Sequence, residues 1–148
     1  MKFKKLLPIL FLLFFLNGFS QNSVSKIETK SGIHYITTDI DYPVTGTYLF
    51  EGAEPTVELN ASGTGFYQLH EQPKRAVIWG FECTETGEPK FIKGYNSSEY
   101  ILWYQYTTPS DADEVESWTA VEFTIHSNSL KMYIQGERIK SYVGKSEK

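Results

Sequence analysis

Cysteine is almost absent from this 148-residue chain, which contains only Cys83. A single cysteine cannot form an intramolecular disulfide, so a hydrophobic core has to hold the chain together. The apolar residues Val77, Trp79 and Phe81 lead to Cys83 at every second position, and free cysteine is among the most often buried residue types. We therefore expect Cys83 to be a buried strand residue, the alternative being a reactive thiol or an intermolecular bridge.

Long apolar runs are also scarce. The only one, Leu6–Leu16, covers eleven residues and includes Pro8, whereas a membrane-spanning helix needs roughly 20. Three lysines lie within Met1–Lys5, and Gly18 and Ser20 place small residues at −3 and −1 before Gln21. This pattern predicts a secretory signal peptide over residues 1–20, export to the periplasm or the medium, and no membrane span after cleavage.

The remaining 128 residues are enough for one domain. Residues 21–31 are polar and lack periodicity, which predicts a flexible N-terminal segment. We expect a β-barrel domain over residues 32–143 and a short C-terminal tail over residues 144–148.

Cations are in the minority. Without Lys2, Lys4 and Lys5 the chain has 11 Lys and Arg against 18 Asp and Glu, which gives a side-chain charge of −7. Nucleic-acid binding depends on clustered Lys and Arg. The charge therefore argues against a nucleic-acid partner, and it also argues against adhesion to anionic lipid.

No window of the chain shows the 3.6-residue apolar stripe of a helix. Short runs rich in Val, Ile, Tyr, Phe, Trp and Thr alternate instead with Gly, Pro, Asn, Asp and Ser, which is the signature of strands. The links are mostly short, so neighbouring strands are antiparallel. We predict an all-β antiparallel meander of about eight to ten strands that closes as a barrel, with a β-sandwich as the alternative. The predicted ranges are 33–38, 44–50, 56–60, 63–69, 75–83, 90–95, 99–106, 117–126, 130–135 and 138–143.

Most of these strands alternate between apolar and polar residues, which is typical of a sheet buried on one face. The predicted buried faces are Val57 and Leu59; Val77, Trp79 and Phe81; Val121, Phe123 and Ile125; and Leu130, Met132 and Ile134. Range 99–106 differs because both of its faces are apolar. Such a strand is either covered on both sides or carries an exposed patch that binds something.

Three segments resemble small secreted bacterial lipocalin-like domains. Thr45-Gly46-Thr47-Tyr48 opens a strand where lipocalins carry Gly-x-Trp, with Tyr48 in place of the tryptophan. Pro55–Gly65 resembles a hairpin in which Asn-x-x-Gly-Thr-Gly joins two strands, and Ala76–Phe81 resembles the strand that follows. Arg138 is a candidate for the family's closing arginine. The resemblance implies a lipocalin-like barrel, names no ligand and transfers no catalytic residue.

Signatures of chemistry are lacking as well. His34, His70 and His126 are too far apart for a compact zinc motif. Asp111 begins an acidic stretch, but the glycine of a calcium loop is missing at its sixth position. There is no Gly-x-Ser-x-Gly elbow and no phosphate-binding glycine loop. We therefore expect a protein that is not an enzyme and uses no metal or cofactor.

Aromatic residues are abundant, and Tyr and Trp combine an apolar body with a polar tip that suits a wet cavity. We expect an exported domain that binds a small apolar or amphipathic ligand. The candidate lining residues are Trp79, Trp103, Tyr104 and Trp118. The alternative is a protein-interaction module, an envelope accessory protein or inhibitor, whose contact surface is formed by residues 99–106 and the acidic loop 107–117.

Overall fold

The computed structural model describes residues 23–50, 56–69, 72–108, 117–129, 132–134 and 137–142, and for residues 49, 50 and 137–142 it describes the backbone alone. All regular structure within these ranges is β-strand, as predicted. The strands are β1 (Val24–Thr29), β2 (Gly32–Thr37), β3 (Gly46–Phe50), β4 (Thr56–Leu59), β5 (Thr64–Tyr67), β6 (Arg75–Cys83), β7 (Phe91–Lys93), β8 (Ser97–Tyr106), β9 (Thr119–His126), β10 (Met132–Ile134) and β11 (Glu137–Tyr142). The predicted signal peptide, residues 1–20, and the predicted tail, residues 144–148, lie outside the described residues.

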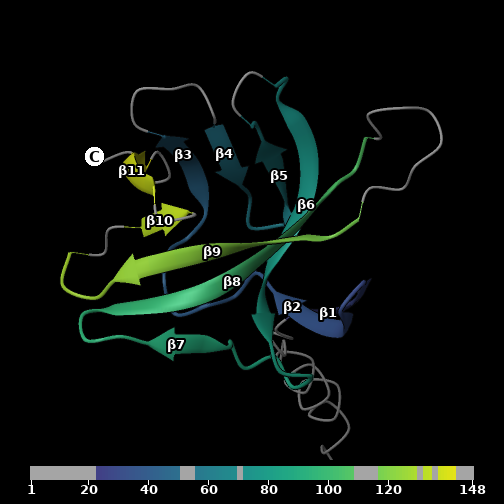
Figure 1. Cartoon of the computed structure of the whole chain (residues 1–148), viewed down its shortest axis with the longest axis horizontal. Coiled ribbons are helices and arrows are strands. Elements are labelled where there is room, and N and C mark those ends of the chain that lie inside the picture. Colours follow the sequence, from purple (N-terminus) through teal and green to yellow (C-terminus); the bar gives the residue numbers. More distant parts are fainter. Residues whose placement is uncertain are drawn as a thin grey trace, which may run out of the picture.

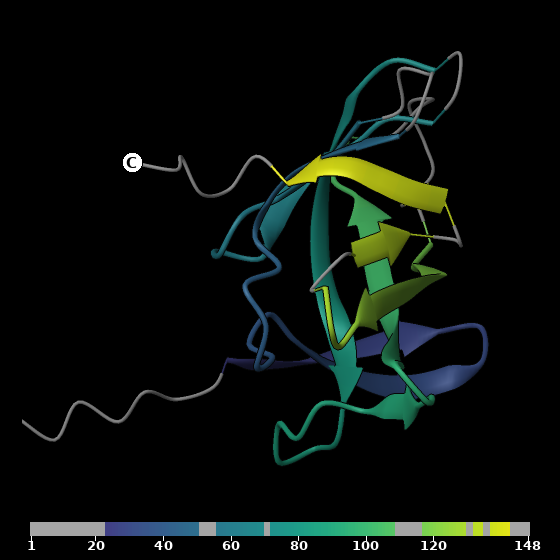
Figure 2. The same cartoon turned by 90° about the vertical axis from the view of Figure 1, so that its left-hand side faces the viewer.

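Eight of the strands pair in chain order and form a cycle. Each of β3, β4, β5, β6, β8, β9, β10 and β11 pairs antiparallel with the next, and β11 pairs back with β3. The sheet therefore curls into a barrel-like meander (Figures 1 and 2). The predicted antiparallel meander is confirmed, and one continuous sheet takes the place of the sandwich alternative.

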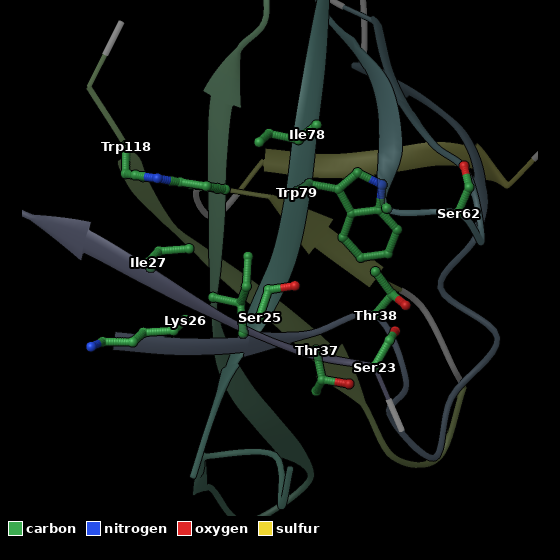
Figure 3. Close-up of a pocket in the computed structure, with 12 residues that line it drawn as sticks. Ser23, Ser25, Lys26, Ile27, Thr37, Thr38, Ser62, Ile78, Trp79 and Trp118 are labelled. Carbon is green, nitrogen blue, oxygen red and sulfur yellow. The ribbon is translucent and has the colours of Figure 1, made fainter. Parts of the chain in front are cut away.

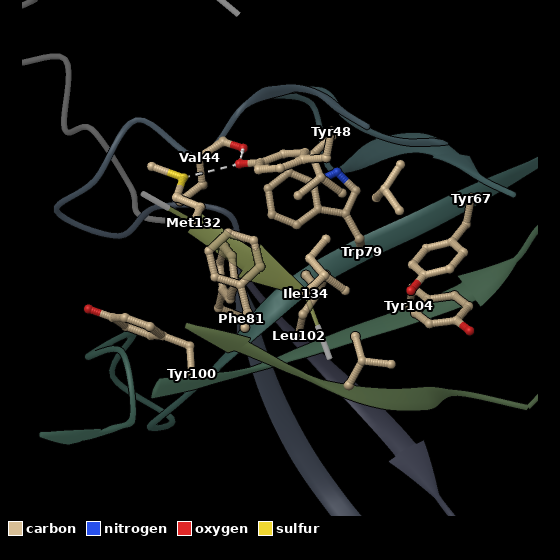
Figure 4. Close-up of a cluster of buried hydrophobic side chains, with 14 of the residues drawn as sticks. Val44, Tyr48, Tyr67, Trp79, Phe81, Tyr100, Leu102, Tyr104, Met132 and Ile134 are labelled. Atoms are coloured by element: carbon tan, nitrogen blue, oxygen red, sulfur yellow. Dashed lines mark hydrogen bonds between the residues drawn. The ribbon is translucent and has the colours of Figure 1, made fainter. Parts of the chain in front are cut away.

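The interior of the curled sheet holds the main core. The predicted inward faces of β4, β6, β9 and β10 all point into it, apart from Leu130, which lies outside the described residues. Figure 4 shows the aromatic centre of this cluster around Trp79 and Phe81. Several core side chains have no accessible surface at all, so no water-sized space touches them. These are Tyr48, Val57, Phe81, Leu102, Phe123, Ile125 and Ile134.

The segment between β2 and β3 adds two apolar side chains to this core. Ile40 and Val44 are buried within it. The Tyr48 hydroxyl donates a hydrogen bond to the carbonyl oxygen of Val44 and lies 3.4 Å from Sδ of Met132. This contact ties the segment to the core (Figure 4).

Two elements lie outside the cycle. The hairpin β1–β2 attaches to β6 through β2, and β7 attaches to the edge of β8. Residues 21–31, expected to be a flexible segment, contain β1. The pattern missed this strand because only Ile27 is buried among its six residues.

Strand β6 pairs with two different strands along one of its edges, and the candidate site lies where one pairing ends and the other begins. It pairs with β5 along Arg75–Ile78 and with β2 along Phe81–Cys83. Trp79 and Gly80 lie between the two pairings. The hairpin β1–β2 and the wall of the barrel diverge from each other at this point (Figure 1).

Candidate binding cleft

The outer face of β8 is covered by the hairpin β1–β2. Trp103 points outward and is only 7% exposed, because Ile27 of β1 and Ile36 of β2 pack against it. Ile101 and Trp118 complete this outer cluster as partly buried members. The hairpin therefore covers the second apolar face of residues 99–106. This face is not an exposed patch, which was the alternative that the sequence left open.

Glu82 of β6 links the hairpin β1–β2 to the barrel. Its carboxylate accepts a hydrogen bond from Nε1 of Trp103 at 3.2 Å and lies 3.2 Å from Nζ of Lys90 and 3.4 Å from Nδ1 of His34 in β2. The His34 ring also contacts the Trp103 ring, with centroids 4.7 Å apart. Burial raises the pKa of Glu82, but the hydrogen bonds outweigh burial, so the net pKa lies below its ordinary value.

A cleft of about 390 Å³ opens where the hairpin diverges from the barrel (Figure 3). Its lining combines apolar surface with hydroxyl groups. The apolar members are Ile27, Ile36, Ile78, Trp79 and Trp118. The hydroxyl-bearing members are Ser23, Ser25, Thr37, Thr38 and Ser62. Lys26 is the only charged residue of the lining, and in Figure 3 its ammonium group points away from the others.

A second, wider cleft of about 550 Å³ continues along β1. It shares Lys26, Ile27 and Trp118 with the first cleft and extends toward Lys30 and Gln105. The two clefts adjoin at these three shared residues, and we refer to them together as the groove.

The exposed edge of β1 forms one side of this groove. Residues Lys26–Lys30 all line the second cleft in succession. Side chains of a strand alternate between its two faces, so successive residues can line one cleft only if the cleft runs along the strand's edge. Within the described part of the chain, β1 pairs with β2 alone. Its other edge therefore offers unpaired backbone N–H and C=O groups to the groove.

The four residues predicted to line one cavity are divided between three places. Trp79 and Trp118 both line the first cleft. Trp79 is nonetheless only 2% exposed, and its Nε1 donates a hydrogen bond to the Thr64 carbonyl oxygen at 2.9 Å. Trp103 supports the groove from beneath the hairpin, and Tyr104 lies in the barrel core, stacked on Tyr67 at 4.3 Å.

The groove residues that the sequence did not reveal belong mainly to β1, such as Ser25, or directly precede it, such as Ser23. Residues 21–31 lack the periodicity that would have marked a strand. Ser62 lies in the turn between β4 and β5, within the segment that resembles a lipocalin-like hairpin, and Gly63 has a positive φ of 79° there. Nothing in the sequence placed this turn beside β1, because the long-range pairings of β6 with β5 and β2 bring the two together.

The other titratable candidates are scattered. His34 contacts Glu82, His126 packs beside Tyr133, and His70 lies outside the described residues, as do Asp111 and the rest of 109–116. Among the described residues, no group of three or more His, Cys, Asp or Glu side chains is placed to hold a metal ion. Cys83 is fully buried, as expected, and burial raises the pKa of its thiol.

Comparisons of the chain with protein-family models, with curated proteins and with solved structures found no match. Within the ranges that the structure describes, no helix is long and apolar enough to cross a membrane.

Proposed function

We propose that this chain is an exported binding protein that captures an extended polypeptide segment along the free edge of β1. The segment adds a strand to the hairpin β1–β2, and its side chains enter the groove on either side of Trp118. Main-chain hydrogen bonds supply affinity in such strand addition, and pockets for alternate side chains supply specificity. The proposal concerns binding only and assigns no catalytic residue.

The observation that carries the proposal is the run of successive residues Lys26–Lys30 along the second cleft. It indicates that backbone as well as side chains faces the groove. Trp118 lines both clefts and is only partly buried. Tryptophan is the residue type most often found at the energetic centre of protein interfaces.

The filled core supports a site on the outside of the barrel. Side chains such as Tyr48, Phe81 and Phe123 have no accessible surface, so a ligand that entered the barrel would have to displace them. A barrel of about eight strands either fills with side chains or holds one small ligand. The groove demands no rearrangement of the core.

A second candidate function is the binding of a small amphipathic molecule in the first cleft alone. The volume of about 390 Å³ favours it, because small-molecule sites measure roughly 300–1,000 Å³. The combination of apolar and hydroxyl-bearing side chains would suit such a ligand. In this case the lipocalin-like resemblance would extend to function, although the ligand would lie outside the barrel.

Selection of random dodecapeptides displayed on phage tests the first candidate, with the processed chain from its own host as bait. The selected peptides are then titrated against the wild type, Trp118→Ala and Ser62→Arg, which narrows the first cleft from an exposed turn. We expect both variants to weaken binding by at least about tenfold. Tyr95→Ala, an exposed aromatic residue outside the groove, is the matched control and should bind like the wild type.

Native mass spectrometry of the same preparation separates the two candidates. A co-purified polypeptide mass that is lost in Trp118→Ala supports strand addition. A co-purified small-molecule mass supports the second candidate instead. Selected peptides that bind all variants equally would contradict a site at the groove.

A further inference from the structure

Exposed charges of alternating sign lie along the free edge strand β1. Lys26 and Glu28 are exposed and two positions apart, so they point to the same face of the strand. Lys30 directly follows β1, is exposed as well, and lines the second cleft together with the other two. In Figure 3 the ammonium group of Lys26 points away from the side chains of the first cleft. The edge of β1 therefore presents a positive, a negative and a positive charge in succession.

The described part of the chain supplies no partner for these charges. None of the three side chains forms an ion pair within it. Their cross-strand neighbours on β2 are neutral, because Lys26 pairs with Tyr35 and Glu28 with Ile33. The carboxylate of Glu85 accepts a hydrogen bond from the Tyr35 hydroxyl at 3.1 Å, so it is held by β2 rather than by Lys26. The charges of β1 are therefore available to a strand that pairs with its other edge.

We propose that the segment added to β1 carries an acidic, a basic and an acidic side chain opposite Lys26, Glu28 and Lys30. This inference rests on the proposed strand addition and specifies its partner, an extended stretch of another polypeptide with the pattern acidic-x-basic-x-acidic. Side chains directly opposite each other on paired strands have Cβ atoms about 4.5–5.5 Å apart, whereas diagonal neighbours are about 7–8 Å apart. Each charge of the segment therefore interacts mainly with the opposite charge that it faces.

The intervening positions of the segment face the apolar side of β1. Ile27 is buried there beside Trp103, and Trp118 is a partly buried member of the same cluster. Paired strands keep their alternation in step, so the side chains between the charges come to lie beside Ile27 and Thr29. We therefore expect apolar or small residues at the x positions. The pattern is symmetric about Glu28 and fits a segment that runs in either direction.

The same charges exclude other segments. Edge strands are commonly protected from indiscriminate pairing by exposed charges, especially lysines, and like charges directly opposite each other are destabilising. A second copy of β1 does not fit, because the pattern acidic-x-basic-x-acidic occurs nowhere in the 148-residue sequence. The net charge of −4 favours basic segments in general. A preference for a segment with two acidic side chains and one basic side chain would therefore report the local charges of β1.

Parallel phage selections with the wild type and with Lys26→Glu/Glu28→Lys/Lys30→Glu test this specificity. The wild type should enrich acidic-x-basic-x-acidic peptides, and the triple variant should enrich basic-x-acidic-x-basic peptides. Reversing the three charges of a peptide selected on the wild type should weaken its binding to the wild type at least about fivefold and strengthen its binding to the triple variant. The difference should shrink as salt rises.

Lys93→Glu is the matched control, because Lys93 is exposed on β7, away from the groove. It changes the net charge by the same amount as the triple variant, and it should keep the preference of the wild type. A peptide whose three charges are each moved by one position, onto its other face, should bind the wild type and the triple variant equally weakly. Thermal unfolding should show that both variants are folded.

The outcomes distinguish this inference from strand addition itself. The same charge pattern in peptides from the wild type and the triple variant would overturn the inference, while slowed amide exchange along β1 would still support strand addition. If neither protein selects any peptide, both the inference and strand addition are overturned. A dimer of the chain in native mass spectrometry that is lost in the triple variant would assign the edge to a second copy and would also overturn the inference.

Discussion

The side chain of Ile36 occupies the space that a Cβ atom on Gly80 would need. An ideal Cβ at Gly80 would lie 2.9 Å from Cβ of Ile36 and 3.0 Å from its Cδ1. The hairpin β1–β2 therefore rests on β6 at a position without a side chain. Since this hairpin forms one wall of the groove, the contact also fixes the position of the groove.

Gly80→Ala should lower the free energy of unfolding by about 1–3 kcal/mol, the usual cost of overpacking. The Cβ of Ile36 is fixed to the backbone, so relief requires movement of β2. Urea unfolding measures the effect. Ile36→Ala should cost less in the background of Gly80→Ala than in the wild type, because it removes the Cγ1 and Cδ1 atoms that crowd the new methyl group.

The double-mutant cycle of these two substitutions supplies the control. The two losses should be clearly less than additive, since each variant changes the same contact. Additive losses in the free energy of unfolding would mean that the packing of the Ile36 side chain is independent of the missing side chain at Gly80.

Glu82 should make the attachment of the hairpin sensitive to acid. Its pKa is lower in the folded chain than its ordinary value of 4.5. A carboxylate of this kind contributes stability above pH 4.5, and this contribution is lost as the pH falls through the lowered folded pKa. Glu82→Gln removes the charge and should therefore remove this part of the pH dependence.

Urea unfolding of both proteins across this pH range measures the difference. The wild type should be more stable than Glu82→Gln above pH 4.5, and the gap should narrow in more acidic solution. Parallel pH profiles for the two proteins would show that the contacts with Trp103, Lys90 and His34 do not stabilise the charged carboxylate.

Cys83 should react slowly with a thiol reagent such as Ellman's reagent in the folded chain. The thiol is fully buried, and burial raises its pKa, so little reactive thiolate is present. We expect the rate to be at least about tenfold lower than in urea, because access requires local opening. Cys83→Ser/Tyr95→Cys, which moves the thiol to an exposed turn, should react at once. Equal rates for the two folded proteins would show that Cys83 is accessible.

Tyr48→Phe should destabilise the chain by about 1–3 kcal/mol, because the buried carbonyl of Val44 loses its hydrogen-bond donor. Thermal unfolding measures the loss. Tyr133→Phe is the control, since Tyr133 is half-buried beside His126, and it should change stability by less than about 0.5 kcal/mol. Equal effects of the two variants would show that the contact between Tyr48 and Val44 is unimportant.

Period-two patterns predicted most of the fold. The alternation in β6 and β9 assigned Trp79, Phe81 and Phe123 to the core, and short turns predicted antiparallel neighbours. Strand β1 was missed because Ile27 is its only buried apolar residue, so its burial depends on Trp103, which lies far away in the sequence. Short-range patterns contain no such information.

The candidate site was only partly predictable for the same reason. The candidate lining residues were chosen for their chemistry. Trp79 and Trp118 border the first cleft, but this cleft lies outside the barrel, and Trp79 also belongs to the core. Neighbouring residues of a strand point to opposite faces, so Trp103 and Tyr104 could not both line one cavity. The sequence did not show which of these two faces of β8 meets the core and which meets the hairpin. The cover over Trp103 follows from the pairing of β2 with β6, which joins residues almost fifty positions apart, such as Tyr35 and Cys83.

Amide hydrogen exchange of β1, with and without a peptide selected on phage, tests the proposed strand addition most directly. We predict that the bound peptide slows exchange along Val24–Thr29 at the edge that faces the groove, while the amides of β9 and β10 keep their rates. Trp118→Ala should abolish the slowing at the same peptide concentration. A bound peptide that leaves exchange along β1 unchanged would contradict strand addition at this edge.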